Sequence, residues 1–239
     1  QQLPQGALEV MVGLGQHQRS FDFLANDLQA RETASRRAEI IKGLQRWFAD
    51  ADSLARSFMI LRDALAHISR ESKDTHFELE QVLRVCKPSN DPVMIDLVNI
   101  AVEIFNKGIP HWFTPRAMRE LGRLLTAIDE EEATKCFEDT LTQIYRLSPS
   151  SVTYELGELL TCWAAFKPRQ AWEKISAMKL KLDHFIVKGL MTIACEVFRT
   201  EGQDDVLVTL LDLLDKNINE HNVLDPYDLA LSLIEVSRG

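Results

Sequence analysis

A seven-residue segment occurs twice in this chain, and this repetition constrains the fold more than any other feature. The segment reads ELGRLLT over Glu120–Thr126 and ELGELLT over Glu155–Thr161, with six of seven residues identical at an offset of 35. Looser copies begin at Gly189 and at Leu229. A period in the mid-thirties is typical of arrays in which each unit is a pair of helices. The sequence therefore predicts an all-α solenoid of antiparallel helical hairpins.

A second helix with a shared apolar spacing is predicted after each of the first three copies. In each of these second helices, a small or branched residue is followed by two larger apolar residues, with about one helical turn between successive residues. The three sets are Ala133/Phe137/Leu141, Ala171/Ile175/Met178 and Val206/Leu210/Leu213.

Helical spacing of apolar residues extends over nearly the whole chain, and it predicts about twelve helices. Side-chain caps followed by proline predict helix starts at Asp91-Pro92, Thr114-Pro115 and Asp225-Pro226. Thr75 and Glu78 have the spacing of a capping box. From residue 88 onward we expect breaks near 88–91, 108–114, 129–131, 148–151, 166–168, 181–184, 200–204 and 220–225.

The repeats resemble degenerate tetratricopeptide repeats over roughly residues 115–239, best at Leu121-Gly122, Ala133 and Phe137. The stretch from Val152 to Lys179 is also similar to a pentatricopeptide repeat. Both resemblances imply a right-handed superhelix of helical hairpins. In such hairpins Gly and Ala let two helices approach closely, and the larger residues fill the space between hairpins.

Two regions are predicted from the pattern: an N-terminal helical region over residues 1–90, either diverged hairpins or a small bundle, and a helical-repeat region over 91–239. Charge divides in the same place. Residues 1–90 balance twelve basic with twelve acidic residues, whereas residues 91–239 carry the whole net charge of −9. Because negative charge repels phosphate backbones, we expect no nucleic acid as partner.

The four cysteines, Cys86, Cys136, Cys162 and Cys195, are widely spaced and each falls in an apolar helical context. They predict buried, reduced thiols and hence a cytoplasmic protein. No apolar stretch reaches the roughly 20 residues of a membrane span. The chain starts with Gln1 rather than Met, so we expect a fragment or a trimmed chain, from which any targeting peptide would have been lost.

No catalytic, cofactor-binding or metal-binding residue is predicted. None of the six histidines has metal-ligand spacing, and the sequence lacks a nucleophile elbow and a glycine-rich phosphate loop. A Cys–His pair assembled by folding stays open. Glu155 and Glu158 have the look of paired catalytic carboxylates, but we expect both to face solvent on a repeat helix.

The candidate partner-binding residues lie next to one another in the sequence. Trp112 and Phe113 stand in a connection bounded by Pro110 and Pro115. Exposed, they would form an anchor for a partner, because Trp is enriched at binding hot spots. Folded back, they would fill a groove between two helices, which is the commoner arrangement.

Three arginines follow on one helix face, since Arg116, Arg119 and Arg123 are spaced i, i+3, i+7. Such a row could clamp acidic side chains or a phosphorylated peptide. The alternative is a solvated face paired with Glu120 and other acidic neighbours.

Three functions are compatible with these features. The first is a non-catalytic scaffold or adaptor that binds a protein or peptide on a helical-repeat surface. The second is an RNA-binding pentatricopeptide-like protein, although Glu155 stands where such repeats usually place Asn, Ser or Thr. The third is an enzyme domain of undefined type. The sequence sets neither the partner's identity nor the oligomeric state.

Overall fold

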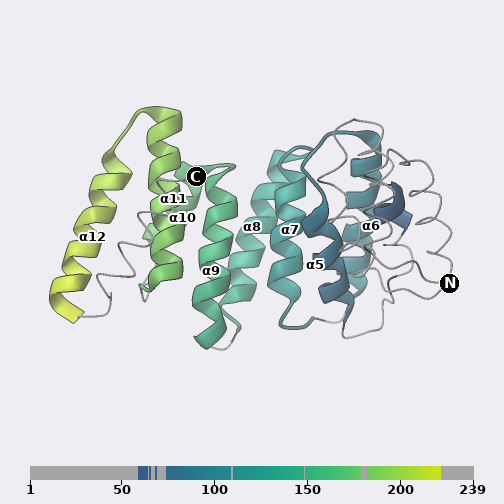
Figure 1. The fold of residues 1–239 in the computed structure, drawn as a ribbon, viewed down its shortest axis with the longest axis horizontal. Coiled ribbons are helices and arrows are strands. Elements are labelled where there is room, and N and C mark those ends of the chain that lie inside the picture. Colours follow the sequence, from purple (N-terminus) through teal and green to yellow (C-terminus); the bar gives the residue numbers. More distant parts are fainter. Residues whose placement is uncertain are drawn as a thin grey trace, which may run out of the picture. The chain divides into compact units, whose positions relative to one another are not determined.

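Helices make up most of the region that the structure describes. In this computed structural model, the described residues are 59–63, 65, 68, 74–108, 110–147, 149–178 and 182–221, and they contain no strand. The all-α prediction is thus confirmed (Figure 1). The count of twelve helices and the superhelical arrangement stay predictions.

The chain divides into two compact units, residues 1–136 and 137–239. In the first unit α5 packs against α6 and α7, and α6 packs against α7. The bounds of these helices are Thr75–Val85 for α5, Pro92–Lys107 for α6 and Thr114–Leu125 for α7. The predicted division at residue 90 concerned the extent of the repeat, and it stays a prediction.

The boundary between the units falls inside α8, Glu130–Ile144. In the second unit α11 packs against α9, α10 and α12, and α9 also packs against α10. Figure 1 shows α9 and α11 side by side. The bounds are Pro149–Ala164 for α9, Pro168–Ser176 for α10, His184–Glu201 for α11 and Asp205–His221 for α12.

Only one of the predicted helix caps within the described residues forms. The Asp91 carboxylate accepts a hydrogen bond of 2.8 Å from the backbone N–H of Val93, with Pro92 as first helical residue. Thr114 is wrong as a cap because α7 includes it, and its hydroxyl bonds elsewhere. Thr75 likewise lies inside α5, where it is buried, so the capping box with Glu78 is also wrong.

Most of the apolar positions predicted for the second helix of each unit are buried in the core. Ala133, Phe137, Ala171 and Val206 are at most 1% exposed. The prediction that Leu213 lies in the core is wrong, because 37% of its surface is exposed. Leu214, one residue later, occupies the core position instead. Part of the sequence pattern, namely residues 1–58, the Asp225-Pro226 start and the copy at Leu229, lies outside the described residues.

Candidate functional site

The turn between α6 and α7 places an indole ring at the protein surface. Half of Trp112 is exposed, so it does not fill a groove between helices. Its ring stacks on Phe113, with 3.6 Å between ring centroids and 30° between planes. The ring of Phe113 is half-buried and lies 4.8 Å from that of Phe77 on α5. Trp112 therefore stacks on the Phe113 ring, which in turn contacts the Phe77 ring of α5.

A short hydrogen-bonded turn sets the backbone of this aromatic pair. The backbone N–H of His111 donates to the Thr114 hydroxyl at 2.8 Å, and the backbone N–H of Thr114 donates to the His111 carbonyl at 2.8 Å. Both bonds close over Trp112 and Phe113. Because the turn is bonded at both ends, the backbone that carries the two rings is held in place.

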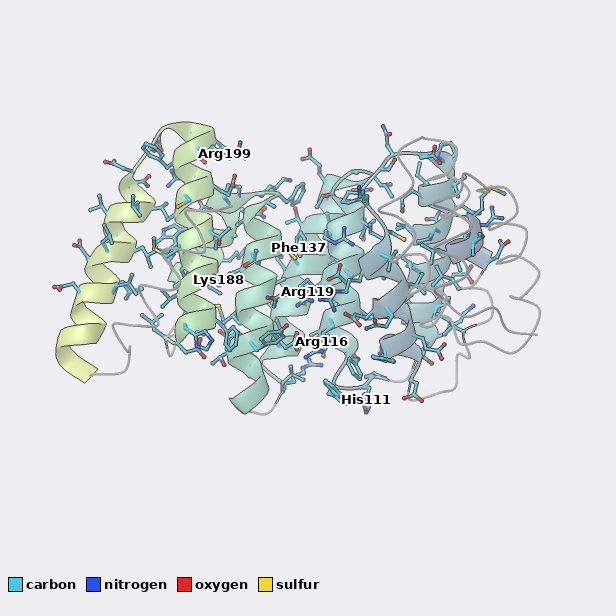
Figure 2. All side chains as sticks on the ribbon, in the orientation of Figure 1. His111, Arg116, Arg119, Phe137, Lys188 and Arg199 are labelled. Atoms are coloured by element: carbon cyan, nitrogen blue, oxygen red, sulfur yellow. The ribbon has the colours of Figure 1, made fainter. Side chains whose placement is uncertain are left out.

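Arg116 adds positive charge beside the rings. Its guanidinium carbon lies 5.3 Å from the ring centroid of Trp112 and 5.4 Å from that of Phe113, within the range of cation–π attraction. Figure 2 shows His111 and Arg116 at the same end of the helices of this unit. We call the surface formed by His111, Trp112, Phe113 and Arg116 the Trp112 surface.

A buried polar pair ties this surface to the core. The Thr114 hydroxyl lies 2.8 Å from Nδ1 of His76, and Nε2 of His76 lies 3.4 Å from the Phe105 carbonyl oxygen. Since a carbonyl can only accept, Nε2 donates to Phe105, and in a neutral ring Nδ1 then accepts from the Thr114 hydroxyl. Burial lowers the pKa of His76, in agreement with that neutral state.

Gly108 makes room for this histidine. A Cβ placed on Gly108 would lie 2.6 Å from Nε2 of His76. Any larger residue would therefore push on the ring that supports Thr114.

The other two arginines of the predicted row serve the contacts between helices. Arg119 is 5% exposed and lies beside the equally buried Glu120. Arg123 donates to the carbonyl oxygens of Leu83 and Cys86, both at 2.9 Å, and to the Glu120 carboxylate at 2.8 Å. Its charge thus satisfies carbonyl groups at the C-terminal end of α5. The row is neither a solvated face nor one continuous clamp, and Arg116 alone adjoins Trp112.

The expectation that Glu155 and Glu158 face solvent is wrong. Glu155 is 3% exposed, and Glu158 is half-buried. The reason is that α9 packs against both α10 and α11, so its buried face is wider than one stripe. Glu120, at the equivalent repeat position in α7, is buried as well.

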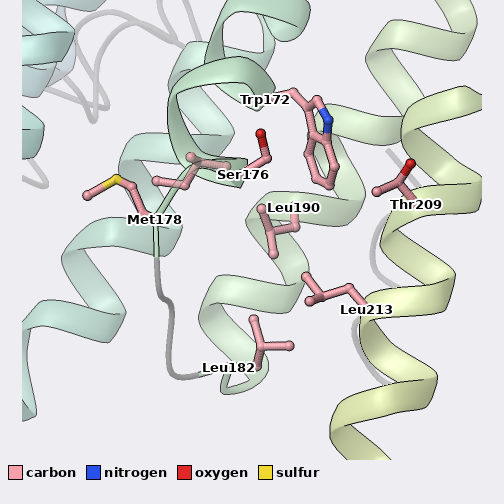
Figure 3. Close-up of a pocket in the computed structure, with 8 residues that line it drawn as sticks. Trp172, Ser176, Met178, Leu182, Leu190, Thr209 and Leu213 are labelled. Carbon is pink, nitrogen blue, oxygen red and sulfur yellow. The ribbon is translucent and has the colours of Figure 1, made fainter.

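Sequence reasoning missed a pocket in the second unit. Its walls come from α10, α11 and α12, and its lining includes Trp172, Met178, Leu190 and Leu213 (Figure 3). Two of these, Met178 and Leu213, were predicted as core residues of the repeat. Their apolar spacing signalled a buried side but not whether a neighbouring helix would fill the space beside them.

The four cysteines differ more than predicted. All four are free, Cys86 is buried, Cys136 and Cys162 are half-buried, and Cys195 is exposed. Burial raises the pKa of the Cys86 thiol to about 12, and partial burial raises that of Cys195. A raised pKa disfavours the reactive thiolate, so neither site resembles an activated nucleophile.

Across the described ranges, no group of three or more His, Cys, Asp or Glu side chains is placed to hold a metal ion. Every helix in the same ranges is too short or too polar to cross a bilayer. The chain matches no protein-family model, and comparison with curated proteins and with solved structures gives no significant similarity.

Proposed function

We propose that this protein is a non-catalytic scaffold that binds a protein partner through the Trp112 surface. The main observation in support of this proposal is the half-exposed Trp112 ring, which stacks on Phe113 and lies beside Arg116. Large apolar surface costs free energy in water, and a rigid aromatic ring loses little conformational entropy when a partner covers it. Trp and Arg are also the residues most enriched at binding hot spots.

The chemistry of the Trp112 surface defines the partner. An apolar or aromatic side chain would cover the indole, and a carboxylate beside it would meet the charge of Arg116. We therefore propose an acidic, aromatic-containing segment as the ligand. A reducing compartment such as the cytoplasm suits the four free cysteines.

The helical-hairpin array remains the proposed architecture behind this surface. It is supported by contacts between alternate helices, α5 with α7 in the first unit and α9 with α11 in the second. Stacked hairpins require such contacts, because the first helix of one hairpin packs on the first helix of the next. The burial of Glu120 and Glu155 at equivalent positions also supports a true repeat. Buried Glu155 counts against base reading at that position, and so against the RNA-binding alternative.

The test compares Trp112→Ala with a matched control, Phe198→Ala. Phe198 is an aromatic residue on α11 with a similar exposed fraction, 54% against 50%. Tagged full-length variants are used to capture partners from source-cell lysate, with and without nuclease. We expect Trp112→Ala to reduce recovery of a specific protein by about tenfold or more, as loss of a hot spot does. Phe198→Ala should retain it, and nuclease should have no effect.

Two outcomes would contradict the proposal. Equal partner recovery by Trp112→Ala and wild type would mean that the exposed ring is not a binding site. Recovery that nuclease abolishes would favour the RNA-binding alternative.

A further inference from the structure

His76 on α5 supports the turn that carries the Trp112 surface. The residue is 1% exposed, and its ring stacks on that of Phe105 on α6, with 4.8 Å between centroids and 26° between planes. A Cβ on Gly108 would lie 2.6 Å from Nε2, so the ring fits closely against the end of α6. Nδ1 of the same ring lies 2.8 Å from the hydroxyl of Thr114, the first residue of α7.

The Thr114 hydroxyl connects this buried ring to the turn. It lies within hydrogen-bond distance of His76 and also accepts the backbone N–H of His111 at 2.8 Å. Trp112 and Phe113 are the two residues between His111 and Thr114. One hydroxyl group therefore closes the loop that presents both rings and links that loop to α5.

Helix α5 contacts the turn at a second point, next to the first. The ring of Phe77, which follows His76, lies 4.8 Å from that of Phe113. Two adjacent residues of α5 thus hold the turn, one through a hydrogen bond and one through a ring contact. A displacement of this end of α5 would disturb both contacts.

A second proton on the His76 ring conflicts with this arrangement. Nε2 already carries the hydrogen that it donates to the Phe105 carbonyl, so an added proton goes to Nδ1. The Thr114 hydroxyl then loses the nitrogen to which it donates. The new charge is also buried, and a buried charge without a counter-ion is unfavourable. The ring regains water only by leaving Thr114, which opens the turn.

Among the described residues, no carboxylate is placed to neutralise a charged His76. Burial lowers the pKa of His76, and the charge of His111 in the turn lowers it further. On α5, Asp74 and Glu78 lie two residues away on either side, without a hydrogen bond or ion pair to the ring. The other charged side chains of α5, α6 and α7 have different partners: Glu80 with Arg84, Asp96 with Arg62, Glu103 with Lys107, Glu120 with Arg119 and Arg123, and Arg116 with the rings of Trp112 and Phe113.

We propose that His76 positions the Trp112 surface and that its protonation opens the turn, so that the surface binds its partner less tightly in acidic solution. The loss of binding rests on the proposed function, whereas the opening of the turn is a property of the chain alone. A histidine in water titrates near pH 6.5. Protonation can therefore raise the open fraction by up to about tenfold for each pH unit below that value, until the pKa of the closed form is reached.

Fluorine NMR of the full-length protein, labelled with 5-fluorotryptophan, reports on the turn without a partner. The chain has four tryptophans, and the variant Trp112→Phe assigns the signal of Trp112. Trp163 and Trp172 belong to the second unit and serve as internal references. Each protein is titrated from about pH 8 to about pH 5, across the range in which histidine gains its proton.

The discriminating variant is His76→Gln, and its matched control is His111→Gln. The control is needed because the His111 ring lies 5.9 Å from that of Trp112 and is itself titratable. Its hydrogen bond to Thr114 comes from the backbone, so His111→Gln retains that bond. The two variants thus separate the buried histidine from the one beside the indole.

We expect the Trp112 signal of wild type to shift in one reversible transition below about pH 6.5, while the Trp163 and Trp172 signals stay unchanged. His76→Gln should abolish the transition, because glutamine gains no proton in this range. His111→Gln should keep the transition and move its midpoint toward higher pH, since a charge that opposes protonation of His76 is removed.

A second measurement relates the turn to binding. The probes are histidine-free peptides from a displayed random library, selected near neutral pH for binding to wild type but not to Trp112→Ala. Their affinity for wild type should fall about threefold or more between about pH 7 and about pH 5. In His76→Gln the same change should stay within about twofold.

Four results would overturn the inference. The Trp112 signal could stay constant over the titration, or shift in His76→Gln as it does in wild type. A common transition of the Trp112, Trp163 and Trp172 signals would mean that acid unfolds the whole chain. Equal peptide affinity at both pH values would mean that the turn does not regulate binding.

Failure of the proposed function has a different signature. If no peptide requires Trp112, the binding role of the surface and its regulation both fail, while the fluorine signal still shows whether His76 opens the turn. If the peptides require Trp112 but bind equally at both pH values, the binding site stands and only its regulation by His76 is refuted.

Discussion

Helices α7 and α9 carry nearly the same seven residues, but each meets its neighbour by different chemistry. In the first unit α7 makes polar contacts with α5 and its C-terminal end: Arg123 donates to the carbonyl groups of Leu83 and Cys86, and Thr114 bonds His76. In the second unit the contact of α9 with α11 is a close approach of backbones. A Cβ placed on Gly157 would lie 2.5 Å from the Phe185 carbonyl oxygen.

The one position that differs between the two copies accounts for part of this contrast. It is Arg123 in α7 and Glu158 in α9. A guanidinium reaches and satisfies the carbonyl groups at a helix end, whereas a carboxylate would repel them. One substitution within a repeat thus changes the kind of contact its helix makes, while the apolar positions beside it stay buried in both copies.

The largest effect is expected at the backbone contact. Gly157→Leu should destabilise the protein by about 3 kcal/mol, since the new side chain meets backbone atoms of α11 that cannot rotate away. Helix propensity alone predicts the opposite sign, a gain of about 1 kcal/mol for replacing Gly in an exposed helix. The midpoint of denaturant unfolding distinguishes the two.

Gly157→Ala serves as the graded control for that experiment. Its single methyl already meets the Phe185 carbonyl, so a smaller loss of the same sign is expected. Stabilisation by either substitution would remove the close-packing argument and with it the contrast between the two units.

A smaller effect is expected at the polar contact. Arg123→Gln should cost about 2 kcal/mol, because it removes charged donors from partly buried carbonyl groups. The equivalent change in the second unit, Glu158→Gln, should stay within about 0.5 kcal/mol. Similar losses at both positions would show that the repeat, rather than the local partner, sets the cost.

Thiol labelling gives that experiment a local measurement. Cys86 is 1% exposed and its carbonyl accepts from Arg123, whereas Cys195 is an exposed residue of α11. Arg123→Gln should therefore accelerate labelling of Cys86 and leave Cys195 unchanged. Equal acceleration at both thiols would indicate global unfolding instead of opening at the end of α5.

The smallest effect is a pH dependence confined to the first unit. Burial lowers the pKa of His76 below its ordinary value of 6.5, so the unfolded chain binds the proton more tightly than the folded one. The stabilising contribution is complete above about pH 6.5 and is lost as the pH falls from there toward the folded pKa. The unfolding free energy of wild type should decline over that range, and His76→Gln should flatten the decline.

The difference between wild type and His76→Gln is the quantity to measure. Subtraction cancels other buried groups, such as Glu80, whose pKa burial raises. A difference that does not change with pH would mean that His76 is equally basic in both states.

Sequence reasoning performed best where one residue type has one physical role. The 3.6-residue spacing predicted the helices, and Asp91-Pro92 predicted a cap that forms. The predictions were least accurate where the role of a residue depends on which side chains or backbone groups pack against it in the folded protein. Thr75 and Thr114 have good capping chemistry, but both are drawn into buried contacts inside their helices. Leu213 has the spacing of a core residue, but the register places Leu214 inward instead.

The candidate surface also contains both residues whose contacts could be predicted from the sequence and residues whose contacts could not. Trp112, Phe113 and Arg116 were predicted as neighbours because they are close in sequence, and the structure joins them in one aromatic cluster. The use of Arg123 inside the unit was not predictable, because it depends on carbonyl groups about 40 residues away.

The sequence by itself determined the helical class and the positions of most buried apolar side chains. These follow from periodicity, which is a local property of the chain. The tertiary structure decided which glycine touches a neighbouring backbone, which arginine satisfies a helix end and where a pocket stays open. Gly157 illustrates the limit: the sequence places a glycine in α9, and only the structure shows that it lies against the backbone of α11. Such choices depend on distances between segments far apart in the chain, which spacing along one helix does not encode.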